Sequence, residues 1–151
     1  MQLKLVARFQ SREDLEKFWM MSISEQGMRL FSGFGMIPGI IDINKNADGT
    51  NKIQNSDGTF HRERTVEKTD KKFVIEMDQF QGSSSHLFSL FQEYWNLSVT
   101  EKAITRTFII QPKNFFAAII NRAIIHPQLK IAMRRNMIAI GKASCVSSFE
   151  I

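Results

Sequence analysis

The sequence lacks the features that mark several classes of protein. Its single cysteine, Cys145, excludes an intramolecular disulfide framework and is typical of a protein from a reducing compartment. No apolar run approaches the roughly 18 residues needed to span a bilayer. The first residues alternate apolar and polar side chains, unlike the continuous apolar segment of a secretory signal. We therefore predict a cytoplasmic protein without an integral membrane segment.

Residue patterns for metal or phosphate binding are also lacking. The three histidines, His61, His86 and His126, do not have the spacing of metal ligands, and the one cysteine is remote from them in sequence. The Gly-Phe-Gly sequence at residues 33–35 follows a predicted helix and not a strand, so it is predicted to terminate that helix and not to cradle phosphate. We expect neither a metal site nor an organic cofactor.

Positive charge is moderate and spread along the chain. The formal net charge is +5, from 20 Lys and Arg against 15 Asp and Glu. Nucleic-acid binding would need this charge on one face. The densest group, Lys130, Arg134 and Arg135, is predicted on the polar side of a final helix, where the helix dipole favours cations near the C-terminus. We predict no nucleic-acid partner; an acidic partner or a membrane surface is the alternative for this group, and the sequence is compatible with a homodimer.

The order of predicted elements is the most informative feature of the chain. Its 151 residues suit a single domain over residues 1–151. Period-two alternation predicts a strand over residues 1–9, and a helix should begin near Arg12 because Ser11 is a good N-cap with Asp14 three positions on. A break at residues 22–24 predicts a second short helix. Glycine and proline residues between 33 and 39 then end helical structure.

The middle of the chain alternates with a period of two and predicts six further strands. Asp57-Gly58 is the strongest hairpin signal, because both central residues of a type I′ turn need positive φ. The segment 81–86 is predicted as a loop, and residues 87–91 as a short helical or irregular turn. The predicted strands cover residues 41–44, 52–55, 59–68, 73–78, 94–99 and 104–110.

A long apolar helix is predicted over residues 114–141. Asn114 is a good N-cap, and the first half is apolar on most sides, which predicts burial on most sides. Pro127 should kink the helix, because proline removes a backbone hydrogen bond and its ring clashes with the preceding turn. The fold class is therefore α+β, with a seven-stranded curved antiparallel sheet wrapped around a long C-terminal helix. Such a wrap leaves a concave space between the two.

The strand over residues 59–68 is charged on both faces. One orientation puts Arg62 and Arg64 inside, where unpaired charge is very costly. The other puts His61 and Glu63 inside, where burial raises the pKa of a glutamate and suits it to proton transfer. A third interpretation is an exposed strand with cross-strand ion pairs. The sequence leaves all three open, and we take Glu63 and His61 as candidate catalytic residues.

Methionine and phenylalanine are abundant, with 8 and 13 residues. They are typical of a core, but in a hollow fold they also suit a ligand pocket, because flexible methionine side chains adapt to varied apolar guests. An apolar cavity of about 300 Å³ would cost roughly 7 kcal/mol if empty, so it must be collapsed, wet or filled. The candidate ligand-binding residues are Trp19, Met77, Trp95, Phe116, Ile120 and Met133 for apolar contact, with Asn96 and Arg106, together with Glu63, for orientation.

Short motifs along the chain resemble one known superfamily. They are Trp19 on the first helix, Pro38-Gly39-Ile40 before the second strand, Ser56-Asp57-Gly58-Thr59 followed by Arg62-Glu63-Arg64, and Trp95 with Leu97. On these residues, the chain resembles the START-related helix-grip superfamily (SRPBCC), in particular its polyketide cyclase/dehydrase and lipid-transport branch, over about residues 2–142.

That resemblance implies a β-α-α-β6-α arrangement with a deep apolar pocket beneath the last helix. It also implies a ligand such as a lipid, sterol, polyketide, hormone or quinone, with Glu63 matching an acid often found on the fourth strand and Trp95 a pocket-side aromatic. The chain departs from the pattern at residues 83–85 and 124–127.

We expect the protein to bind a small hydrophobic molecule. The alternative is a cyclase/dehydratase-like enzyme using Glu63 or His61 as acid or base, and a weaker one is a protein-binding module using the basic helix. No catalytic set is shared across the superfamily, so the sequence does not decide whether the protein is an enzyme.

Overall fold

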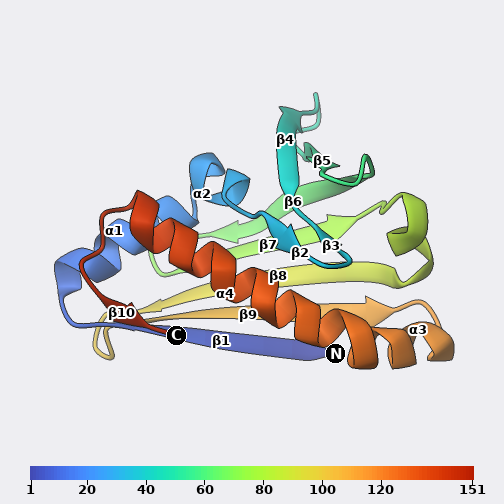
Figure 1. Cartoon of the computed structure of the whole chain (residues 1–151). Coiled ribbons are helices and arrows are strands. Elements are labelled where there is room, and N and C mark those ends of the chain that lie inside the picture. The colour runs from blue at the N-terminus through green and yellow to red at the C-terminus, as the bar shows by residue number, and fades with distance from the viewer.

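The computed structural model describes residues 1–151, apart from the side chains of residues 83 and 84 (Figure 1). The chain is α+β, with a large antiparallel sheet and a long C-terminal helix, as predicted. The elements in chain order are β1 (Gln2–Phe9), α1 (Arg12–Ser22), α2 (Glu25–Arg29), β2 (Gly33–Phe34), β3 (Ile37–Pro38), β4 (Ile40–Lys45), β5 (Asn51–Asn55), β6 (Phe60–Lys68), β7 (Lys72–Asp78), the 3₁₀-helix η1 (Gly82–His86), β8 (Phe88–Ser98), β9 (Ala103–Pro112), α3 (Phe115–Ile120), the π-helix η2 (Asn121–Ile125), α4 (His126–Ala143) and β10 (Phe149–Glu150).

The main sheet has the strand order β10-β1-β9-β8-β7-β6-β5-β4, with every neighbouring pair antiparallel. Seven of its strands are the predicted ones. The eighth, β10, comes from the C-terminal tail and pairs with β1 through Arg8 and Glu150. Strands β2 and β3 form a separate small hairpin that packs against α4.

Strand β8 begins earlier than predicted. Residues 87–91 were predicted as an irregular turn, but β8 starts at Phe88 and pairs with the end of β9. The register shifts between Phe88 and Leu90, which lets both Phe88 and Phe91 be buried although they are three residues apart. This β-bulge interrupts the period of two on which the sequence prediction depended. The predicted loop at residues 81–86 contains the 3₁₀-helix η1, and its side chains at 83 and 84 lie outside the described residues.

The concave face of the sheet packs on α4, which crosses in front of it in Figure 1. Strand β1 shows why the sheet has one apolar face: Leu3, Leu5, Ala7 and Phe9 alternate with more exposed residues and are all buried. Helix α4 contributes a matching buried stripe at helical spacing. Its apolar members are Leu129, Ala132, Met133, Met137 and Ile140.

The C-terminal helical region changes its hydrogen-bond register before Pro127. Asn114 caps α3 by accepting a 2.8 Å hydrogen bond from the N–H of Ala117. The N–H of His126 bonds to the carbonyl of Asn121, five residues back, which is the register of a π-helix. Pro127 then stands in the first turn of α4, where its missing N–H is tolerated. The irregularity predicted at Pro127 is therefore one turn of π-helix.

Helix α3 does not have the burial that the sequence predicted. Phe115 is 75% exposed, Phe116 76% and Ile119 51%. The reason is position, because α3 lies at the end of the sheet, where its outer side is uncovered (Figure 1). Within the described part of the chain, no helix combines the length and apolarity required to cross a membrane.

The C-terminal tail docks on α4 at Gly141. A Cβ at this position would lie 2.3 Å from Cε1 of Phe149. The Phe149 ring in turn packs on Phe9 and Phe18, with centroid distances of 5.6 and 5.3 Å. Glycine at residue 141 therefore leaves space for the ring that fastens the tail to the core.

We predict that Gly141→Ala lowers the free energy of unfolding, even though alanine has a helix propensity up to about 1 kcal/mol more favourable than glycine. In a Phe149→Ala background the clash is gone, so the same substitution should raise the free energy of unfolding. Urea denaturation of the unmodified protein, the two single variants and the double variant measures both effects. An effect of the same sign in the two backgrounds would contradict the proposed packing.

Candidate ligand pocket

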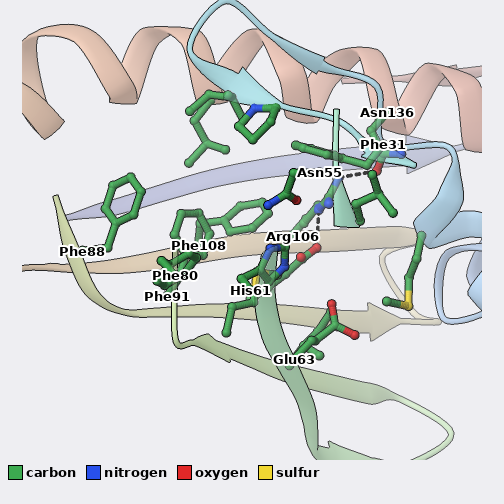
Figure 2. Close-up of a pocket in the computed structure, with 18 of the residues that line it drawn as sticks. Phe31, Asn55, His61, Glu63, Phe80, Phe88, Phe91, Arg106, Phe108 and Asn136 are labelled. Atoms are coloured by element: carbon green, nitrogen blue, oxygen red, sulfur yellow. Dashed lines mark hydrogen bonds and ion pairs between the residues drawn. The ribbon is translucent and has the colours of Figure 1, made fainter. Parts of the chain in front are cut away.

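A cavity of about 130 Å³ lies between the concave face of the sheet and α4 (Figure 2). Among its lining residues Met36 and Asp57 are exposed, so the cavity opens between the β2–β3 hairpin and the turn that joins β5 to β6. Left empty and dry, a cavity of this size would cost about 3 kcal/mol at roughly 24 cal/mol per Å³. Its aromatic lining consists of Phe31, Phe80, Phe88, Phe91, Trp95 and Phe108.

Edge-to-face contacts hold part of this aromatic lining in place. The ring centroids of Phe80 and Phe88 are 5.5 Å apart, those of Phe88 and Phe91 5.9 Å, and those of Phe91 and Phe108 5.0 Å. Such geometry is the preferred one for aromatic pairs. The rings come from β8, β9 and the segment after β7, so one apolar wall is assembled from three parts of the sheet.

Strand β6 directs His61 and Glu63 into the cavity, where they are 9% and 2% exposed. Arg62 and Arg64 lie on the other face of the strand. This settles the orientation that the sequence left open, and the reason lies in the neighbouring strand. Residues 62 and 64 stand opposite Asp78 and Glu76 of β7, with which the two arginines form ion pairs.

Burial shifts the pKa values of the two inward groups in opposite directions. Loss of water around the carboxyl, together with the nearby negative charge of Glu93, raises the pKa of Glu63 to about 8. Loss of water around the imidazole lowers the pKa of His61 to about 4, against a smaller opposing effect of Asp57. Near pH 7 Glu63 is therefore protonated and His61 is neutral.

A buried ion pair within the sheet is hydrogen-bonded to the helix at the edge of the cavity. The Nε of Arg106 donates a 2.5 Å hydrogen bond to Oε1 of Glu93, and both side chains are almost fully buried. A second nitrogen of Arg106 donates a 2.7 Å hydrogen bond to Oδ1 of Asn136 on α4. The guanidinium also lies over the rings of Trp95 and Phe108, 4.4 and 5.0 Å from their centroids. The positive charge of Arg106 is thus fully engaged by protein groups.

Two polar atoms of the lining have no hydrogen-bond partner among the described residues. They are Nε2 of His61 and Nδ2 of Asn136, both buried. An unpartnered buried polar group costs about 1–3 kcal/mol. Both residues line the cavity, so a molecule inside it with a polar group of its own could satisfy them.

Five of the predicted site residues line the cavity. They are His61, Glu63, Met77, Trp95 and Arg106. Met77, Trp95 and Arg106 lie on the inward side of β7, β8 and β9, as their alternation with outward residues predicts.

The other five predicted residues do not line the cavity, so the structure does not bring them to this site. Trp19 and Met133 are buried, but they belong to the solid core beside the cavity. Ile120 is half-buried against that core. Asn96 is exposed, because it follows the inward Trp95 on a strand and must point the other way. Phe116 is exposed on α3.

The sequence analysis missed Glu93 and Asn136, although both carried a signal. Glu93 is two residues before Trp95, so the two side chains share the inward face of β8. Asn136 lies on α4 three residues after Met133 and four before Ile140, which puts a polar side chain on the buried stripe. As for metal ligands, the described residues contain no cluster of three or more His, Cys, Asp or Glu side chains that could hold an ion.

The two shifted groups on β6 should give the free energy of unfolding opposite pH dependences. The pKa of Glu63 rises from an ordinary 4.5 to about 8 on folding, so its ionisation lowers stability as the pH increases between these values. The pKa of His61 falls from 6.5 to about 4, so stability increases with pH over that interval. Below pH 6.5 the two groups change the free energy of unfolding in opposite directions as the pH rises. Above pH 6.5 only the decrease caused by Glu63 remains.

We predict that the free energy of unfolding falls by about 2 kcal/mol between pH 6.5 and 8, and that Glu63→Gln removes this fall. In His61→Gln the fall should instead begin near pH 4.5. Urea denaturation at a series of pH values measures these slopes. Glu67→Gln, at the partly exposed end of the same strand, is the control and should keep the fall, whereas a Glu63→Gln protein that also keeps it would refute the assignment.

Comparison with known proteins identifies the fold. No family model matches the chain, and no curated protein is similar to it in sequence. Norcoclaurine synthase from Thalictrum flavum, solved with dopamine and hydroxybenzaldehyde, matches with a TM-score of 0.62 and 15% identity, over 98% of this chain and 87% of that one. Ara h 8.0201 matches with a TM-score of 0.59 and 10% identity, over 96% and 97%. One half of the di-domain ARO/CYC protein BexL matches with a TM-score of 0.58 and 10% identity, over 98% of this chain and 50% of that one.

These identities are low, and the likeness concerns the course of the backbone over nearly the whole chain. It agrees with the sheet wrapped on α4 and with the resemblance seen in the sequence. The chain therefore has the helix-grip fold of the Bet v 1-like and START-related proteins.

Proposed function

We propose that the protein binds a small, electrically neutral and largely apolar molecule in the cavity between the sheet and α4. The observation that carries this proposal is a mostly apolar cavity that contains two unpartnered buried polar atoms, Nε2 of His61 and Nδ2 of Asn136. The general class is the one expected from the sequence, a small hydrophobic ligand. Size, charge and hydrogen bonding narrow it further.

The volume of the cavity limits the size of the ligand. About 130 Å³ is close to the roughly 150 Å³ of an apolar cavity that holds benzene. The cavity therefore suits a ligand of about one ring. A long lipid or a multi-ring polyketide would have to displace lining side chains, of which Met28, Met36 and Met77 are the most adaptable.

The charge of the cavity favours a neutral ligand. Arg106 is neutralised by Glu93 and covered by aromatic rings. Near pH 7 Glu63 is protonated and His61 is neutral, because of the shifted pKa values of both groups. The remaining ionisable lining residue, Asp57, is exposed at the mouth. A carboxylate or ammonium group inside the cavity would therefore leave water without meeting an unpaired opposite charge, which is strongly unfavourable.

Hydrogen bonding favours an oxygen-bearing ligand. Protonated Glu63 and the amide nitrogen of Asn136 are donors, and His61 can donate or accept through Nε2. A hydroxyl or carbonyl oxygen on the ring would satisfy these groups. Norcoclaurine synthase, which has the same fold, was solved with dopamine and hydroxybenzaldehyde. Each is a single ring with oxygen substituents, and of the two hydroxybenzaldehyde lacks an amine.

We predict that benzyl alcohol binds at pH 7 and that benzoate and benzylamine, of similar shape but charged, bind at least about tenfold more weakly. Isothermal titration calorimetry measures the three affinities. Leu87→Trp should abolish binding because it enlarges a lining side chain, whereas Phe116→Ala, outside the cavity, should leave the affinity unchanged. Equal affinity for the three compounds, or binding of long-chain lipids alone, would contradict the proposal.

A second candidate function is enzymatic, as in a cyclase or dehydratase. Its support is a protonated Glu63 and a neutral His61 two residues apart on one strand, both facing the cavity (Figure 2). Glu63 would donate a proton to a departing hydroxyl or to a carbonyl oxygen. His61 would take a proton from the neighbouring carbon, so that the ligand loses water or enolises.

If this second function holds, Glu63→Gln should keep ligand affinity but lower turnover about 10²-fold or more. The rate in the unmodified protein should also fall above about pH 8, where Glu63 loses its proton. Turnover of an enolisable aromatic ketone, followed by exchange of its α-hydrogen with deuterated water, provides the assay. Equal rates in the two proteins would remove Glu63 from the reaction and leave the binding function standing.

A further inference from the structure

The outer side of the C-terminal helices carries most of the exposed large apolar side chains. Of ten such residues in the described chain, six lie between Phe115 and Ile138. Phe115 and Phe116 are three-quarters exposed, and their rings contact each other with centroids 6.2 Å apart. We call this set the apolar ridge: Phe115, Phe116, Ile119, Ile124, Ile131 and Ile138.

Helical spacing makes the ridge continuous along the helices. Ile131 and Ile138 are seven residues apart and lie on the same side of α4, two turns from each other. Ile124 stands one residue before the end of η2, and the two phenylalanines begin α3. Figure 1 shows α4 in front of the sheet and α3 at the end of the sheet, so the side of α4 opposite its buried stripe faces away from the protein.

The charges beside the ridge are all positive. No aspartate or glutamate occurs between Glu101 and Glu150. Every cation from Lys113 to Lys142 is exposed, and within the described residues none of them forms an ion pair. These cations are Lys113, Arg122, Lys130, Arg134, Arg135 and Lys142.

We propose that the apolar ridge docks on the surface of an anionic lipid bilayer. Aromatic and aliphatic side chains on one side of a helix, flanked by Lys and Arg, are what an interfacial helix uses to bury apolar area while its cations meet acidic headgroups. Phe115 and Phe116, at the free end of the ridge, insert most deeply. The helices lie in the plane of the surface and do not cross it.

A second copy of the chain fits this surface less well. A two-fold interface through the ridge would bring the cations of both copies together, with no acid on the same helices to compensate. An acidic bilayer supplies the missing negative charge and a fluid apolar phase together.

The docking helix is linked directly to the cavity wall. The side-chain nitrogen of Asn121 in η2 donates a 3.2 Å hydrogen bond to the carbonyl of Leu87. Leu87 lines the cavity. The inferred docking rests on the exposed side chains alone and does not depend on the proposed ligand.

The test is co-sedimentation with vesicles of phosphatidylcholine and phosphatidylserine in equal amounts, with vesicles of phosphatidylcholine alone for comparison. We expect binding to the mixed vesicles, little to the neutral ones, and a decrease with added salt. The double variant Phe115→Ser/Phe116→Ser should lose at least about tenfold in affinity, and Lys130→Ala/Arg134→Ala roughly fivefold for each cation removed. The matched control Met20→Ser/Val66→Ser removes exposed apolar side chains elsewhere and should bind like the unmodified protein.

Three outcomes would overturn the proposal. They are absence of binding to the mixed vesicles, equal binding by the Phe115→Ser/Phe116→Ser variant, and loss of binding in the control. Light scattering at increasing protein concentration completes the test. A dimer that the two phenylalanine substitutions abolish would show that the ridge is an interface between copies.

Discussion

The buried contact of Arg106 with Glu93 and Asn136 is the interaction on which the rest of the structure depends. It joins two central strands to the middle of α4 at the edge of the cavity. An ion pair in such a place contributes little net stability when intact, but removing one partner costs about 3–5 kcal/mol. It therefore holds the sheet and the helix together next to the space between them.

The same contact determines the electrostatics of the cavity. Glu93 forms the ion pair with Arg106, so the guanidinium is not free to attract the carboxyl of Glu63. The negative charge of Glu93 also opposes ionisation of Glu63. Among the side chains that the structure describes, Glu63 accepts only a long hydrogen bond, 3.4 Å, from the amide nitrogen of Asn51. The proton on Glu63 is therefore a consequence of how Arg106 is partnered. The interior of the cavity, with Glu63, Glu93, Arg106 and His61, is therefore neutral near pH 7, and the fifth ionisable lining residue, Asp57, is exposed at the mouth.

Much of the fold follows from local sequence patterns. Period-two alternation, the N-caps Ser11 and Asn114, and the hairpin signal at Asp57-Gly58 were sufficient to predict seven strands, the helices and the α+β class. The type I′ form predicted for that turn was wrong, because only Gly58 of the two residues has a positive φ. The failures have physical causes outside local pattern. The bulge near Phe88 shifts the alternation, β10 forms because Phe149 finds a space left by Gly141, and the end of the sheet leaves α3 uncovered.

The site was predicted only in part, because the direction of a side chain depends on partners distant in sequence. His61 and Glu63 could be assigned to the inside only once Asp78 and Glu76 were known to stand opposite Arg62 and Arg64. Alternation from Trp95 would have found Glu93 and excluded Asn96, since one shares its face and the other does not. Phe116 shows that an apolar side chain alone does not predict burial, because such a residue can lie in a core or on an exposed surface.

The π-helical turn η2 has a consequence for how the two halves of the C-terminal helix can change in evolution. Such a turn is equivalent to one residue inserted in an α-helix, and each residue rotates the helix by about 100°. It therefore separates the orientation of α3 from that of α4, whose Asn136 must keep its contact with Arg106. Natural selection could alter the surface presented by α3, through substitution or loss of this single residue, without disturbing the interior.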